Sequence, residues 1–258
     1  MNQDLLQRFP DDILLHDRMA RNYVAGGYQN KARFHFVESL KLQRKQKLDE
    51  GKTGLIFIAG MHRGGTGFTY RSLRDGLGII ENAAETSDIA EGIPDTGGVY
   101  FVPAFAGLGA PHWDPYARGT IVGITGGTGR AHIVRATLEA IAYHVRDVLE
   151  VVRQSAPSET PLLRADGGGS DNRFLMQFQA DMLGIPVEVP EIAETTALGA
   201  AHLAGLAVGF WDSEKDLASK WQANARYEPR MSRDEADKLY NGWERAVERA
   251  RDWERKGP

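Results

Sequence analysis

The stretch LLRADGGGSDNRFLMQ, residues 162–177, places three consecutive glycines between a short apolar segment and a helical pattern. Glycine adopts positive φ without steric cost and lets another molecule lie against the backbone, so Gly167, Gly168 and Gly169 indicate close approach by a ligand. A tight structural turn without a ligand is the alternative, because a glycine cluster alone is a weak signal. The pattern predicts a strand, a glycine turn and the start of a helix.

The helix after the turn has one predicted buried face, because Leu175, Phe178 and Met182 recur at spacings of three and four. Its N-cap is one of the polar residues that precede it: Ser170, Asp171 or Asn172. A helix start presents unpaired N–H groups and the positive end of the helix dipole, which suit a phosphate or another anion. The turn is therefore a candidate site for a small-molecule anion.

The composition is that of a globular chain. Its 258 residues are 42% hydrophobic, enough for a sizeable core. No run approaches the roughly 18 apolar residues of a membrane span, and the proline-broken start MNQDLLQRFPDD lacks the features of a signal peptide. Cysteine is absent, which excludes disulfides and thiolate metal sites and favours a cytoplasmic location.

Charge is distributed unevenly along the chain. Residues 1–72 hold 12 Lys+Arg and 7 Asp+Glu, net +5, while the remainder holds 19 against 28, net −9. The basic excess lies in KARFHFVESLKLQRKQKLDEGK, residues 31–52, where no nucleic-acid-binding motif accompanies it. We expect a solvated amphipathic helix there and no nucleic-acid partner.

A second glycine loop follows the apolar run Leu55 to Ala59 in TGLIFIAGMHRGGTGFTY, residues 53–70. It is not a Walker A loop, because Thr66 stands where that motif has Lys, although Arg63 could supply the charge. The segment resembles the loop of sulfotransferases that holds the 5′-phosphate of their sulfonucleotide donor. The candidate phosphate loop consists of Gly60, Arg63, Gly64, Gly65 and Thr66.

From Leu73 onwards the chain resembles the C-terminal half of the bacterial glycerol kinases of the FGGY carbohydrate kinase family. The resemblance is carried by LRDGLGIIE, PDTGGVYFVPAFAGLGAPHWDPYARGTIVGIT, RAHIVRATLEAIAYHVRDVLE, ADGGGSDNRFLMQFQADMLGIPVEVPE and ETTALGAAHLAGLAVGFW. The family's second signature is present as Gly119, Ile121, Gly123, Ile124, His132, Ile133, Ala136, Thr137, Leu138 and Glu139. The resemblance implies an α/β fold, an incomplete ATPase lobe like those of actin and hexokinase, which are ribonuclease H-like.

The resemblance also implies ligands. It predicts ATP with Mg²⁺ as the nucleotide and glycerol as the phosphoryl acceptor. Gly168 then lets the nucleotide lie against the backbone, with Gly167 and Gly169 beside it, and Asn172 contacts the adenine. Aligning on LRDGL puts Gly67 near the nucleotide, whereas an alternative alignment makes residues 65–67 a phosphate turn.

Two further helices are predicted. RAHIVRATLEAIAYHVRDVLEVV, residues 130–152, indicates a long helix packed on a sheet. Its apolar stripe consists of Ile133, Thr137, Ile141, Val145 or His144, Val148 and Val152. Its histidines, His132 and His144, are predicted as polar or core-edge side chains, since their spacing of twelve does not fit a helical metal pair. The small residues of ETTALGAAHLAGLAVG predict close packing against neighbouring backbones.

The organisation follows from where the resemblance begins. We predict a basic extension at residues 1–72, of foreign or rearranged origin, joined as a chimera to a kinase lobe at residues 73–258. The strand predicted at 55–59 would replace one that the lobe lacks. By resemblance the general-base Asp belongs to the N-terminal lobe, so no catalytic residue is predicted.

Two alternatives remain. One is a sulfonucleotide- or phosphate-binding protein that uses residues 60–67. The other is a non-catalytic lobe that acts in assembly, and the formation of a homo-oligomer stays open.

Overall fold

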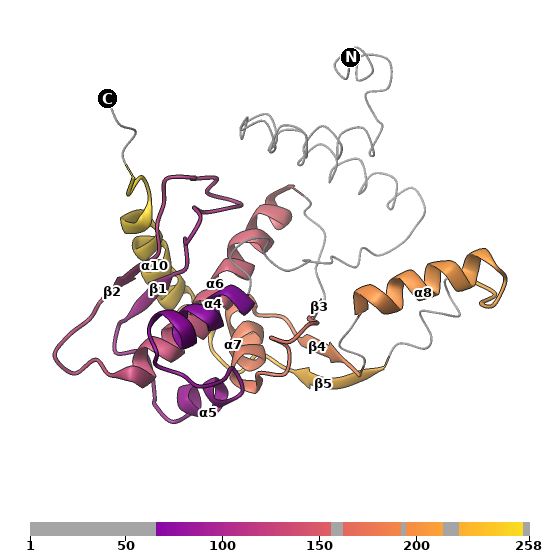
Figure 1. Ribbon diagram of the computed structural model, residues 1–258, viewed down its shortest axis with the longest axis horizontal. Helices are drawn as coiled ribbons and strands as arrows, with labels where there is room; N and C mark the ends of the chain where they lie inside the picture. Colours follow the sequence, from indigo (N-terminus) through magenta and orange to yellow (C-terminus); the bar gives the residue numbers. More distant parts are fainter. Residues whose placement is uncertain (1–65, 156–161, 192–194, 214–221, 255–258) are drawn as a thin grey trace, which may run out of the picture. The chain divides into compact units, whose positions relative to one another are not determined.

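The computed structural model describes residues 66–155, 162–191, 195–213 and 222–254 (Figure 1). The helices are α4 Thr66–Arg71, the π-helical turn η1 Ser72–Gly76, α5 Glu85–Glu91, α6 Arg130–Ser155, α7 Arg173–Leu183, α8 Thr195–Ala207 and α10 Arg233–Ala250. The strands are β1 Tyr100–Val102, β2 Thr120–Val122, β3 Leu163–Arg164, β4 Val187–Pro190 and β5 Ala223–Tyr227. The strand predicted at 55–59 and most of the basic extension lie outside the described residues.

The chain divides into two compact units, and the second, residues 57–148 and 161–258, holds the candidate site. In this unit β1 and β2 form an antiparallel pair with Phe101 opposite Ile121. A three-stranded sheet has the order β3-β4-β5, in which β3 runs parallel to β4 and β4 antiparallel to β5. The predicted sequence of strand, glycine turn and helix is confirmed, since α7 links β3 to β4 (Figure 1).

The burial predicted for three residues of α7 is confirmed, since Leu175, Phe178 and Met182 are all buried. The single buried face is not, because Met176 and Gln179 on other sides of the helix are buried as well. The helix ends at Gly184, whose φ of 67° supplies the left-handed residue that commonly closes a helix. The backbone N–H of Gly184 donates to the Ala180 carbonyl at 2.9 Å.

The long helix α6 is buried on more sides than the sequence predicted. The expected stripe includes Ile133 and Ile141, which are only half-buried, whereas Val134 and Leu138 have no exposed surface. The reason is that separate clusters cover different faces of the helix. Val134 packs with Leu73 and Ile80, and Ala136 packs with Val99 and Phe101 of the β1 region. The predicted packing of the helix on a sheet is therefore confirmed at β1.

Helix α10 comes close to β1 because it carries a glycine at the contact. A Cβ atom on Gly242 would overlap the ring and hydroxyl of Tyr100, so no larger residue fits without displacement. The Tyr100 hydroxyl donates to the Leu239 carbonyl at 3.1 Å, which fixes the same contact. Next to it, the fully buried Trp243 stacks on Tyr143 of α6 at 5.4 Å between ring centroids.

The small-residue helix α8 differs from its prediction. Its described side chains are largely exposed, with Leu203 71% exposed. Close packing is present at Gly205, where a Cβ atom would lie 2.5 Å from the Trp211 indole. The absence of a side chain at Gly205 thus lets the Trp211 ring, from the loop after the helix, pack against the α8 backbone.

A buried carboxylate on α6, Asp147, collects hydrogen bonds from α10. Tyr240 donates its hydroxyl at 2.6 Å and Trp243 donates Nε1 at 3.1 Å. His144 Nδ1 and His112 Nε2 lie 3.4 and 3.5 Å from the same carboxylate. Burial by itself would raise the pKa of Asp147, but the interactions with His112, His144 and Tyr240 hold that pKa well below its ordinary value. His144, predicted at the edge of the core, is a buried member of this network.

We predict that Asp147→Asn lowers the free energy of unfolding at pH 7 by about 3 kcal/mol, because donors that meet a buried carboxylate lose their charged acceptor. The folded pKa lies below the unfolded one, so the ionised group stabilises the fold above about pH 4 and this contribution is lost as the pH falls. Urea titrations between pH 7 and 3 should show a shallower acid dependence in the variant. Asp75→Asn, which removes an exposed partner of Arg74, is the control and should change little. Equal acid dependence in Asp147→Asn and the unmodified chain would contradict the prediction.

Candidate nucleotide site

The glycine turn between β3 and α7 is held by hydrogen bonds to Ser170, and its Gly167 and Gly168 face open space. Gly167 has a φ of 80°, which favours glycine, and its carbonyl accepts from the N–H and the hydroxyl of Ser170 at 2.9 and 2.7 Å. A Cβ atom added at Gly167 or Gly168 would meet nothing within 4 Å. The backbone of the turn therefore faces open space, where a flat molecule could lie against it.

Asn172 is the N-cap among the three polar residues that the sequence offered. Its side-chain oxygen accepts from the Leu175 N–H at 2.9 Å, and the Phe174 N–H donates to the Ser87 hydroxyl of α5 at 3.1 Å. Two of the N–H groups at the start of α7 are thus already paired. The helix start thus has fewer free amides for an anion than the sequence suggested, and an anion site there stays a prediction.

The Asn172 side chain is buried and has protein partners on both its nitrogen and its oxygen. Its Nδ2 donates to the Thr86 hydroxyl at 3.0 Å, while its oxygen faces the first turn of α7. The resemblance assigned this amide to adenine, and that contact stays a prediction. Sequence reasoning missed Thr86, because nothing in the local pattern of α5 marks a residue that contacts another helix 86 positions away.

Helix α4 contacts the Thr86–Asn172 pair through the side chain of Tyr70. Burial raises the pKa of the Tyr70 hydroxyl, and hydrogen bonds with Thr86 and Asn172 oppose that rise. Thr66 and Gly67 form the first turn of α4, so the structure brings the helix that carries Gly67 to the Asn172 side of the turn. Gly60, Arg63, Gly64 and Gly65, the rest of the candidate phosphate loop, lie outside the described residues.

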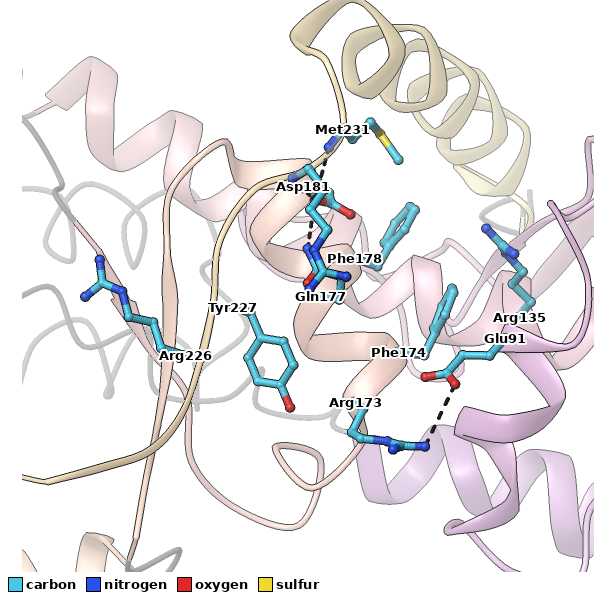
Figure 2. A pocket seen from close by; sticks show the side chains of 11 residues that line it. Glu91, Arg135, Arg173, Phe174, Gln177, Phe178, Asp181, Arg226, Tyr227 and Met231 are labelled. Carbon is cyan, nitrogen blue, oxygen red and sulfur yellow. Dashed lines mark hydrogen bonds and ion pairs between the residues drawn. The ribbon is translucent and has the colours of Figure 1, made fainter.

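A hollow of about 430 Å³ lies beside α7, lined in part by Glu91, Arg173, Phe174, Gln177, Asp181 and Tyr227. Figure 2 shows Arg173 linked to Glu91, and Asp181 linked to Gln177 and to Met231. The charged side chains that Figure 2 draws with dashed lines thus have protein partners on neighbouring segments. We interpret the hollow as a gap between packed segments, whose lining side chains link α7 to α5 and to the segment after β5.

The family is decided by a sequence profile. The profile of the FGGY family of carbohydrate kinases, C-terminal domain, matches residues 17–208. The chain belongs to the FGGY family of carbohydrate kinases. The resemblance read from the sequence and the α/β kinase-lobe fold are thereby confirmed.

The relatives of this FGGY chain include close glycerol kinases. It is 58% identical to glycerol kinase 2 of Thermotoga maritima over 203 residues, 79% of this chain and 40% of that protein. It is 56% identical to the glycerol kinase of Nitratidesulfovibrio vulgaris over 200 residues, 78% of this chain and 39% of that protein. The chain thus spans about two fifths of the length of these curated relatives.

Solved structures agree with this assignment. Plasmodium falciparum glycerol kinase with ADP superposes with a TM-score of 0.66 at 39% identity, covering 72% of this chain and 37% of that chain. Xylulose kinase from Lactobacillus acidophilus follows with a TM-score of 0.61 at 25% identity, with the same coverage. These likenesses place the described FGGY fold among actin- and hexokinase-like kinases.

The comparisons give no support to a chimeric origin or to the sulfonucleotide alternative. The FGGY profile begins at residue 17, inside the segment assigned to the basic extension. The boundary between residues 72 and 73 stays a prediction. Within the described part of this FGGY chain, no helix is both long and apolar enough to cross a membrane.

We predict that Asn172→Ala lowers the free energy of unfolding by about 2 kcal/mol, because it removes an N-cap and leaves buried partners unpaired. The matched control is Ser232→Ala, the exposed N-cap of α10, whose hydroxyl accepts from the Glu235 N–H at 3.2 Å. We expect a cost of about 1 kcal/mol there. Urea denaturation of both variants checks the difference, and a smaller loss in Asn172→Ala than in Ser232→Ala would show that the buried cap is not the costlier one.

Proposed function

We propose that this chain is the nucleotide-binding part of a glycerol kinase-like phosphotransferase that uses ATP, with Mg²⁺, and glycerol. The observation that carries the proposal is the open space over Gly167 and Gly168, in the turn that follows β3, in a chain of the FGGY family. Its relatives are named as glycerol kinases, and one solved neighbour was determined with ADP. A cytoplasmic location is part of the proposal, since a cysteine-free chain needs no oxidising compartment.

The described residues fit the nucleotide better than the metal ion. Open space over Gly167 and Gly168 accommodates a base or ribose against the backbone. In the described ranges, no group of three His, Asp or Glu side chains could hold a metal ion. Mg²⁺ in kinases is held mainly by phosphates, waters and one or two carboxylates, so we assign it no residue here.

The part that these residues play is binding and orientation. Phosphoryl transfer is catalysed mostly by positioning and charge stabilisation, and a carboxylate accepts the proton of the attacking hydroxyl. By family resemblance that carboxylate belongs to the N-terminal lobe. The proposal for this chain is therefore to hold the adenosine side of ATP, with the acceptor and its base supplied by the other lobe.

We predict that the polypeptide binds MgATP weakly and that Gly168→Val weakens binding at least about tenfold, because the branched side chain fills the space over the turn. The fold should tolerate the change, since a Cβ atom there meets nothing within 4 Å and the positive φ belongs to Gly167. Gly126→Val is the matched control, as Gly126 is exposed and equally open. Calorimetric titration with MgATP measures both. Unchanged affinity in Gly168→Val would place the nucleotide elsewhere.

We also predict that the 258-residue polypeptide alone shows no measurable glycerol-dependent turnover of ATP, because general-base catalysis needs a carboxylate within hydrogen-bonding reach of the acceptor hydroxyl. The measurement is formation of glycerol 3-phosphate, before and after addition of a separately expressed N-terminal lobe of a glycerol kinase. Turnover by the polypeptide alone that Gly168→Val removes would show that it carries a complete catalytic cleft.

A further inference from the structure

Thr86, on α5, is the point where three helices meet beneath the glycine turn. Its side chain has no exposed surface. Its hydroxyl donates to the Ala83 carbonyl at 2.6 Å and accepts from Asn172 Nδ2 at 3.0 Å. The Tyr70 hydroxyl of α4 interacts with both Thr86 and Asn172. One buried oxygen therefore connects α5 to the N-cap of α7 and to α4.

The directions of these bonds leave the Asn172 amide one orientation. The single Thr86 proton goes to the Ala83 carbonyl, so toward Asn172 the Thr86 oxygen can only accept. At the other end the Leu175 N–H can only donate, so it needs the carbonyl oxygen of the amide. Both ends place oxygen toward α7 and nitrogen toward Thr86. A flipped amide would place its nitrogen, a donor, against the Leu175 N–H and its oxygen, an acceptor, against the Thr86 oxygen. Both contacts would then be unfavourable in a buried site.

Other contacts between α5 and α7 do not reach the Asn172 side chain. Ser87 accepts from the Phe174 backbone N–H, and the Asp88–Arg173 ion pair is 3.5 Å long between exposed side chains. These contacts hold the helix start in place, whereas Thr86 alone among the three orients the amide.

We propose that Thr86 is a positioning residue for nucleotide binding. Its hydroxyl sets the orientation of the Asn172 amide and anchors the C-terminal end of the glycine turn. This inference rests on the proposed nucleotide-binding function. The amide then presents its nitrogen, a donor, on the side away from α7, while its oxygen points to the first turn of α7. On this proposal Asn172 meets a purine first through its amide nitrogen.

The test compares Thr86→Val, which keeps the shape and removes the hydroxyl, with Thr86→Ser, which keeps the hydroxyl. Thr137→Val is the matched control, because Thr137 is equally buried and its hydroxyl donates only within α6, to the Ile133 carbonyl at 2.7 Å. Circular dichroism first establishes that each variant is folded at the temperature used. Calorimetric titrations then measure dissociation constants for MgATP and for magnesium triphosphate, which lacks adenosine.

We expect Thr86→Val to weaken MgATP binding about fivefold, the scale of one hydrogen bond, and to leave triphosphate binding unchanged. Thr86→Ser and Thr137→Val should bind MgATP like the unmodified polypeptide. Full MgATP affinity in Thr86→Val would overturn the proposal. So would equal losses in Thr86→Val and Thr137→Val, or equal losses for MgATP and triphosphate, because these outcomes indicate a general loss of structure.

A second readout needs no nucleotide. Hydrogen exchange of the Leu175 backbone amide reports its bond to the Asn172 oxygen, and we expect about fivefold faster exchange in Thr86→Val but not in Thr137→Val. If the unmodified polypeptide binds no MgATP, the proposed function fails, and exchange still decides the coupling of Thr86 to Asn172. Unchanged Leu175 exchange in Thr86→Val would overturn that coupling.

Discussion

The candidate site depends on the need to satisfy one buried amide, the side chain of Asn172. Its oxygen closes the first turn of α7 and its nitrogen bonds Thr86 of α5. An unpaired buried donor or acceptor costs about 1 to 3 kcal/mol, so each partner constrains the others. The glycine turn ends at this residue, and its position is consequently set by α5 and α4 as much as by its own backbone.

A second buried polar group, the Asp147 carboxylate, acts in the same way on the helices behind the site. Tyr240 and Trp243 bring α10 against α6, and Gly242 lets α10 approach β1 at Tyr100. These contacts fix α10 against α6 and β1 at defined positions. Buried polar groups need defined directions, and apolar packing does not. We therefore attribute the precise placement of the helices to the polar pairs and most of the driving force to the apolar core.

What the sequence could predict was local. Periodicity located α6 and three buried residues of α7, and glycines after an apolar segment located the turn. These signals depend on residues within one element. Contacts between distant segments were out of reach. Asn172 was one of three possible caps, and its contact with Thr86, 86 positions away in the sequence, could not be predicted from local pattern. The stripe on α6 was misjudged because the helix is covered by several clusters, whereas the argument from periodicity assumes one buried face.

The two glycines of the turn that face open space, Gly167 and Gly168, have different reasons to be glycine. Gly167 needs a φ of 80°, which the fold imposes. Gly168 has neither positive φ nor a close neighbour, so the fold would accept a side chain there. A glycine at such a position costs stability, about 0.4 to 1 kcal/mol relative to alanine, because it leaves the unfolded chain more freedom. The structure gives Gly168 no internal reason that offsets this cost. The proposed approach of a nucleotide to the Gly168 backbone would supply such a reason, because the open space there suits a ligand and a side chain would fill it.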